Sequence, residues 1–154
     1  MILKENILNV IKDLLKEKEI FLVSLDINAS NNIRLVIDSM KGVTLSECVQ
    51  LNRAIEKGLN RNHEDFNIEV TSPGLGTPFK VREQYVKNIG KEVEVILKTG
   101  QKVNGMLIQT DDNNFIIEQD KQVRIEGEKK MQRIKERVSF FYGAVSKVKN
   151  VIKF

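Results

Sequence analysis

Residues 68–79 read Ile-Glu-Val-Thr-Ser-Pro-Gly-Leu-Gly-Thr-Pro-Phe and contain both prolines of the chain. Apolar and polar residues alternate up to Thr71, which is the pattern of a half-buried strand. Pro73 cannot donate to a strand ladder and Gly74 can adopt a positive φ, so a reverse turn is predicted there. Because Pro73 and Pro78 each fix a φ angle, this stretch is expected to form a stiff joint between two parts of the chain.

The residues before the joint predict the order helix, strand, strand, helix, strand. Thr44 and Glu47 have the spacing of a capping box and begin the second helix. The helices are predicted at residues 2–18 and from 44 to about 58, and the strands at 21–27, 33–37 and 66–71. The first two strands, joined by turn-forming residues, are expected to form an antiparallel hairpin. Two helices on one face of a three-stranded sheet make an α+β layer.

The residues after the joint predict a short helix and then only strands. The helix is expected within 81–90 and ends at a glycine. Gly105, inside a predicted strand, fits the bend of a sheet that closes on itself, so an SH3-like or Sm-like barrel is expected. Its strands are predicted at 92–97, 102–110, 115–118, 138–140 and 148–154, with a short 3-10 turn at 142–145. Residues 121–137 are highly charged and are compatible with a long exposed hairpin or a charged helix. The segment is expected to be a solvated, mobile insertion, with an RNA-contacting arm as the alternative.

The predicted fold class is therefore α+β, with an N-terminal α-β-β-α-β layer domain followed by a small SH3-like or Sm-like β-barrel. The N-terminal domain is expected at residues 1–72 and the barrel at 91–154. Residues 73–90 between them form the proline-containing joint and the short helix.

Charge is distributed unevenly between the two halves of the chain. Residues 1–78 carry nine Lys/Arg and eleven Asp/Glu, whereas residues 79–154 carry sixteen Lys/Arg and ten Asp/Glu. An excess of cations in one domain is typical of proteins that approach a phosphate backbone, and it also occurs on ordinary solvated surfaces.

The sequence offers little for catalysis. Cys48 is the only cysteine and lies on the apolar side of a predicted helix, so we expect it to be a small core residue. His63 is the only histidine and is expected in a polar loop. Since no Walker, HExxH, GxSxG or GxGxxG motif occurs, we predict a protein that is not an enzyme and uses no metal or other cofactor.

The N-terminal residues lack the pattern of a signal peptide, and no window approaches 18 apolar residues. One cysteine also excludes an intramolecular disulfide, which suits a reducing compartment. A soluble, cytoplasmic protein is therefore expected.

The Thr-Ser-Pro-Gly-Leu block at residues 71–75 resembles the block between the two domains of the ribosome maturation factor RimP family. The order of elements along the whole chain is similar to that family, as are the position of Cys48 and the segment from Arg82 to Gly90. The family continues the block with an acidic residue, an arginine and Pro-Leu, whereas this chain has Gly-Thr-Pro-Phe at residues 76–79. Any role of that arginine therefore cannot be transferred to this chain.

The resemblance implies a ribosome assembly factor that binds the free small ribosomal subunit, promotes its late maturation and contacts small-subunit ribosomal protein twelve. Ribosomal RNA is a further candidate partner, no membrane is involved and a monomer is expected. The candidate partner-binding residues come from the joint, the short helix and the basic half of the chain: Ser72, Pro73, Gly74, Leu75, Pro78, Arg82, Lys98, Lys102, Lys147 and Lys149.

Two other classes of function remain open from the sequence. An Sm-like RNA-binding regulator would use the barrel alone and form rings through its edges, so it would not be monomeric in solution. An enzyme with Cys48 as its nucleophile would show rapid labelling of that thiol in the native state.

Overall fold

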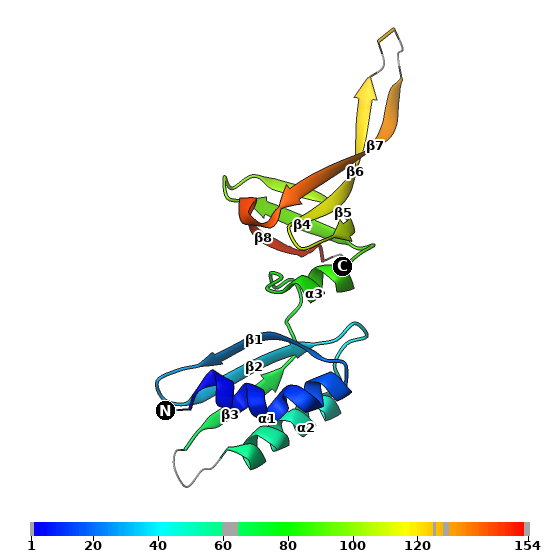
Figure 1. Cartoon of the computed structure of the whole chain (residues 1–154). Helices are drawn as coiled ribbons and strands as arrows, with labels where there is room; N and C mark the ends of the chain where they lie inside the picture. Colours follow the sequence, from blue (N-terminus) through cyan, green and yellow to red (C-terminus); the bar gives the residue numbers. More distant parts are fainter. Residues whose placement is uncertain (1, 60–64, 125, 128–129, 153–154) are drawn as a thin grey trace. The chain divides into compact units, whose positions relative to one another are not determined.

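A computed structural model describes residues 2–59, 65–124, 126–127 and 130–152 of the chain (Figure 1). The chain divides into two compact units, Met1–Gly74 and Leu75–Phe154. His63, for which a loop position was predicted, lies outside the described residues. Among the described residues, no helix is long and apolar enough to cross a membrane.

The first unit has the predicted order of elements. These are α1 (Lys4–Glu17), β1 (Phe21–Ile27), β2 (Asn32–Asp38), α2 (Leu45–Gly58) and β3 (Asn67–Thr71). Figure 1 shows both helices on one side of the sheet. Ile7 and Ile11 of α1 are fully buried, as are Leu51 and Ile55 of α2, and they share one core with Leu35 of β2. The amphipathic patterns of the sequence therefore predicted this layer correctly.

The strands of the first unit form the order β1-β2-β3. β1 and β2 are antiparallel, which confirms the predicted hairpin, and the Asn28 side chain closes its turn by accepting hydrogen bonds from the N–H groups of Ser30 and Asn32, both at 2.9 Å. β3 pairs in parallel with β2. The parallel pairing follows from the connection, because α2 carries the chain back across the sheet before β3 begins.

The predicted capping box is present at the start of α2. The Thr44 hydroxyl accepts a hydrogen bond from the Glu47 N–H at 3.1 Å, and a Glu47 carboxylate oxygen accepts one from the Thr44 N–H at 2.9 Å. These bonds satisfy backbone donors that a helix start otherwise leaves unpaired. The bonds that the Glu47 carboxylate accepts from Thr44 lower its pKa, because the ionised carboxylate accepts them better than the acid does.

The second unit consists of one short helix, a five-stranded antiparallel sheet and a 3-10 turn. The elements are α3 (Arg82–Lys87), β4 (Glu92–Leu97), β5 (Lys102–Thr110), β6 (Asn114–Arg124), β7 (Met131–Phe141), η1 (Tyr142–Ala144) and β8 (Val145–Asn150). The predicted helix, the 3-10 turn and the first two strands are confirmed. The core contains the fully buried Val93, Val95, Leu107, Phe115 and Ile117.

The described strands of the second unit do not close into a barrel. Their order is β7-β6-β5-β4-β8, so β7 and β8 are the two edges of an open sheet. The segment before α3 lies beside β8, because the Phe79 N–H donates to the Val148 carbonyl at 2.8 Å. The structure therefore shows an open sheet in the described residues, and the predicted SH3-like or Sm-like barrel is not confirmed.

β6 and β7 are much longer than predicted. Their register runs without a break from Asn114 opposite Phe141 to Arg124 opposite Met131. The charged segment 121–137, for which the sequence allowed a hairpin or a helix, therefore belongs to a hairpin in its described part. Figure 1 shows that the far end of this hairpin extends beyond the other strands of its sheet.

Two glycines explain local features of the chain. The prediction that Gly74 has a positive φ is wrong: the turn falls at Leu75–Gly76, and Gly76 has a φ of +72°. Glycine adopts this left-handed conformation without the steric cost that a side chain would add. At Gly105 the reason for glycine is close approach, since an added Cβ would lie 2.9 Å from the Glu118 carbonyl oxygen of β6.

Candidate partner-binding surfaces

The second unit is organised around a cluster of aromatic rings under α3. Tyr85 of α3 contacts three rings, with centroid distances of 5.0 Å to Phe79, 5.3 Å to Phe115 and 5.2 Å to Tyr142. Burial, followed by the influence of Tyr142, raises the pKa of Tyr85 to about 12. Tyr85 is therefore a neutral core residue at physiological pH, and it fixes α3 to the sheet.

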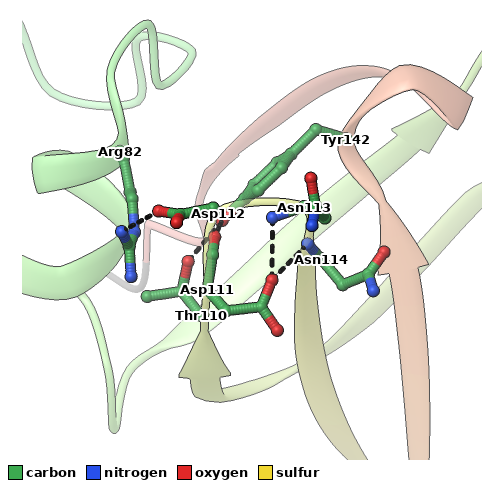
Figure 2. Close-up of polar contacts among 7 residues, drawn as sticks. All are labelled: Arg82, Thr110, Asp111, Asp112, Asn113, Asn114 and Tyr142. Atoms are coloured by element: carbon green, nitrogen blue, oxygen red, sulfur yellow. Dashed lines mark hydrogen bonds and ion pairs between the residues drawn. The ribbon is translucent and has the colours of Figure 1, made fainter.

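A polar network joins α3, the β5–β6 turn and η1 (Figure 2). The Arg82 guanidinium forms an ion pair with the carboxylate of Asp112. The Asp111 side chain accepts hydrogen bonds from the backbone N–H groups of Asn113 and Asn114, at 2.8 and 2.7 Å. The Tyr142 hydroxyl donates to the Asp111 carbonyl at 2.9 Å. The network thus ties together three segments that are distant in the sequence.

The charge of Asp111 is part of this network. Its pKa is lowered, first by the hydrogen bonds from Asn114 and Asn113 and to a smaller extent by Arg82. The carboxylate therefore stays ionised and holds the turn in one conformation. Arg82, predicted as a partner-binding residue, is engaged within its own unit, although half of its side chain remains exposed.

The sheet brings three of the predicted lysines onto one face. Ile96 of β4 is opposite Lys102 of β5 on one side and opposite Lys147 of β8 on the other, and both lysines are exposed. Lys149 follows two residues after Lys147, so it points to the same side of β8. Its ammonium group lies 3.9 Å from a carboxylate oxygen of Glu94. We call Lys102, Lys147 and Lys149 the lysine face.

The other predicted residues lie elsewhere. Lys98 is exposed in the turn after β4, and its backbone N–H donates to the Ala144 carbonyl at 3.2 Å. Ser72, Pro73 and Gly74 end the first unit, whereas Leu75, with 91% of its surface exposed, begins the second. Pro78 is half-buried in the second unit. The predicted residues are therefore distributed over several segments of both units.

The strand β7 places three cations of the charged segment 121–137 in one row, which the sequence did not predict because the conformation of this segment was left open. Arg133, Lys135 and Arg137 are exposed and lie at every second position, so they point to the same side of the strand. The signal was present as strict alternation in residues 133–137. It could be used only if this segment was known to be a strand, because on a helix the same residues would point in different directions.

The structure gives no arrangement for cysteine or metal chemistry among the residues it describes. Cys48 is half-buried against the core of the first unit, and burial, followed by the charge of Glu47, raises the pKa of its thiol. A raised pKa lowers the fraction of reactive thiolate. Within the described ranges, no group of three or more His, Cys, Asp or Glu is placed to hold a metal ion.

The fold and these surfaces define an α+β protein of two units, the second of which presents cationic side chains on an antiparallel sheet. Comparison with known proteins identifies the family to which this chain is related. A model of the RimP N-terminal domain family matches residues 10–76, which is almost the whole of the first unit from the middle of α1 onward.

Relatives extend the similarity into the second unit. The proteins named "Ribosome maturation factor RimP" include those of Christiangramia forsetii (38% identity, covering 73% of this chain and 74% of the relative) and Porphyromonas gingivalis (38%, 84% and 86%). The protein of the same name from Flavobacterium psychrophilum is 34% identical over 77% of each chain. The chain belongs to the RimP family.

Proposed function

We propose that this protein acts in late maturation of the small ribosomal subunit by binding the free subunit. The observation that carries this proposal is the similarity to proteins named ribosome maturation factor over most of both chains. The match to the P. gingivalis protein spans 130 residues, more than the first unit contains, so it includes part of the second unit. Small-subunit ribosomal protein twelve is the proposed protein partner, as the family resemblance implies.

The proposed role is binding without catalysis, in the cytoplasm, where small subunits assemble. The exposed Lys98, Lys102 and Lys147, together with the half-buried Lys149, supply ammonium groups that can contact phosphates of ribosomal RNA. Because of such contacts, the affinity of the protein for the small subunit depends on the charge and shape of that particle. A factor whose binding surface on the subunit disappears when the RNA reaches its mature fold will leave at that point.

Co-sedimentation tests the proposal. The full-length protein, added to purified particles, is expected to pellet with free small subunits and to stay in the supernatant with complete ribosomes. Equal occupancy of both particles, or binding to neither, would refute it. A pull-down with purified protein twelve then tests whether that protein is sufficient for binding.

Charge variants test the contribution of the lysine face. Lys102→Gln combined with Lys147→Gln should weaken binding to the small subunit and lower the slope of log affinity against log salt by roughly 0.7–0.9 for each phosphate that the variant no longer neutralises. The matched control is Lys12→Gln combined with Lys16→Gln, which removes two exposed lysines from α1. A control variant that binds as weakly as the lysine-face variant would show that only net charge matters.

The Sm-like alternative is distinguished by oligomeric state. A ring built through sheet edges needs both edges free, whereas the edge of β8 already accepts a hydrogen bond from Phe79 within the chain. We therefore propose a monomer. Sedimentation equilibrium at micromolar concentration checks this, and a stable ring would favour the alternative.

A further inference from the structure

The face of β7 opposite to the one that bears the inward-pointing Phe140 carries a row of cations, which is separate from the lysine face. We call this face the outward side of β7. Side chains of a strand alternate between its two faces, so Arg133, Lys135 and Arg137 lie on one face at intervals of about 6.4–6.8 Å. All three residues are exposed. β7 is an edge strand of the described sheet, so within that sheet only β6 lies next to it.

The opposite strand neutralises this row only in part. Arg137 and Lys135 share one carboxylate, with Glu118 oxygens 3.5 Å from the Arg137 Nε and 3.6 Å from the Lys135 Nζ. Arg133 is opposite Gln122, which is uncharged. The row also faces Asp120, opposite Lys135, so three cations meet two carboxylates and Arg133 has the least compensated charge.

The acidic residue of β7, Glu136, lies on the other side of the strand. Glu136 points away from the cationic row by the same alternation and pairs with Lys121 of β6 at 2.7 Å. Charged residues on edge strands often serve to prevent pairing with other chains. That purpose would be met by charges of either sign on either face, so it does not explain why the three cations of β7 share one face.

An exposed aromatic ring continues the same row. Phe141 is four residues after Arg137, hence on the same side, and 59% of its surface is exposed. Its neighbour Phe140 points inward and stacks on Phe115 at a centroid distance of 5.4 Å. Gly143 leaves room for the Phe141 ring, since a Cβ there would lie 2.7 Å from its Cε1 atom.

The polar network of Figure 2 holds the end of β7 that bears this ring. The N–H of Tyr142, the next residue, donates to the Asn113 carbonyl at 3.2 Å, and the Tyr142 hydroxyl donates to the Asp111 carbonyl. The exposed ring therefore projects from a fixed backbone. An exposed aromatic ring in line with a row of cations is a combination by which proteins bind single-stranded nucleic acids.

We propose that the outward side of β7 binds single-stranded RNA, with Arg133, Lys135 and Arg137 on successive phosphates and a base stacked on Phe141. The inference deepens the proposed function, on which its biological meaning rests, by assigning unpaired RNA to a second surface of this unit. Stacking suits any base, so the surface recognises an unpaired strand rather than a particular sequence.

Fluorescence anisotropy of the full-length protein with a labelled oligouridine of about 12 nucleotides, within the usual size of single-strand sites, tests the proposal. The triple change of Arg133, Lys135 and Arg137 to Gln should lower the salt slope by about 2, from roughly 0.7 for each phosphate. Phe141→Ala should weaken binding about 5- to 150-fold, as expected for the loss of one stacked base. The matched control changes three exposed cations of the first unit to Gln: Lys12, Lys16 and Arg53.

Three results would overturn the proposal: no binding of oligouridine by the unmodified protein at low salt, equal weakening by the control triple variant, or tighter binding of an RNA duplex of the same length. Co-sedimentation with small subunits, run in parallel, separates this inference from the proposed function. Pelleting with small subunits without oligouridine binding removes only the RNA surface, whereas oligouridine binding without pelleting removes the proposed function. Tyrosine fluorescence confirms that each variant of the second unit is folded.

Discussion

Replacing Gly105 by alanine should destabilise the second unit through a steric clash with β6. The new Cβ would lie 2.9 Å from the Glu118 carbonyl oxygen and 3.0 Å from the Ile117 Cδ1 atom. The first atom belongs to a backbone held in the sheet, and Ile117 is fully buried, so neither neighbour can move away easily. Overpacking of this kind costs roughly 1–3 kcal/mol in the free energy of unfolding.

Gly143→Ala is the matched control, and its added Cβ would be even closer to another atom. It would lie 2.7 Å from the Phe141 Cε1 atom, but that ring is largely exposed and can rotate away into solvent. The expected change in the free energy of unfolding is therefore within about 0.5 kcal/mol. If the contact distance alone decided the cost, Gly143→Ala would be the more destabilising of the two variants.

Urea denaturation followed by tyrosine fluorescence measures this difference in the second unit alone. The chain has no tryptophan, and its two tyrosines, Tyr85 and Tyr142, both lie in that unit. The midpoint should fall clearly for Gly105→Ala and hardly at all for Gly143→Ala. Equal effects, or a larger effect of Gly143→Ala, would refute the argument that the mobility of the contacted atom decides the cost.

Three further predictions concern other parts of the molecule. Thr44→Ala removes the helix cap and should lower the stability of the first unit by about 1 kcal/mol in a far-ultraviolet circular dichroism melt, while the exposed Ser46→Ala on the same turn should not. Gly76→Ala forces alanine into a left-handed conformation and should cost about 1–2 kcal/mol in the tyrosine-detected unfolding of the second unit; an unchanged midpoint would show that the turn adapts. The pKa of Tyr85 is about 12 in the folded protein against 10 for a free tyrosine, so as the pH rises the unfolded chain loses this proton first. The contribution of Tyr85 to the free energy of unfolding is therefore fully present below pH 10 and decreases as the pH rises toward 12. Tyr85→Phe should remove this alkaline loss, as measured by urea midpoints at several pH values.

Local features of the fold were predictable from the sequence because they depend on neighbouring residues. The apolar spacing of α1 and α2 identified the buried faces of both helices, and Thr44 with Glu47 identified the start of α2. The hairpin of β1 and β2 followed from alternation on either side of a turn. In each case the information lies within a few residues along the chain.

The turn at the joint was predicted two residues too early, at Gly74 instead of Gly76. Proline and glycine mark a region where the chain changes direction, but several glycines close together offer alternative positions for the left-handed residue. Packing decides between them. At Gly76 the backbone passes so close to Ile152 that a Cβ would lie 2.7 Å from its Cδ1 atom, a proximity that no local pattern encodes.

The candidate surfaces depended on tertiary structure to a greater extent. The basic character of the second half was visible in the sequence, and so were the alternating cations of β7. Only the sheet order places Lys102 and Lys147 on either side of Ile96, and only the pairing of β6 with β7 leaves Arg133 opposite an uncharged residue. Residue patterns alone therefore specified most helices and strands and the half of the chain that is cationic. Which cations share a face followed only from the folded sheet, because strand pairing joins residues whose separation along the chain carries no periodic signal.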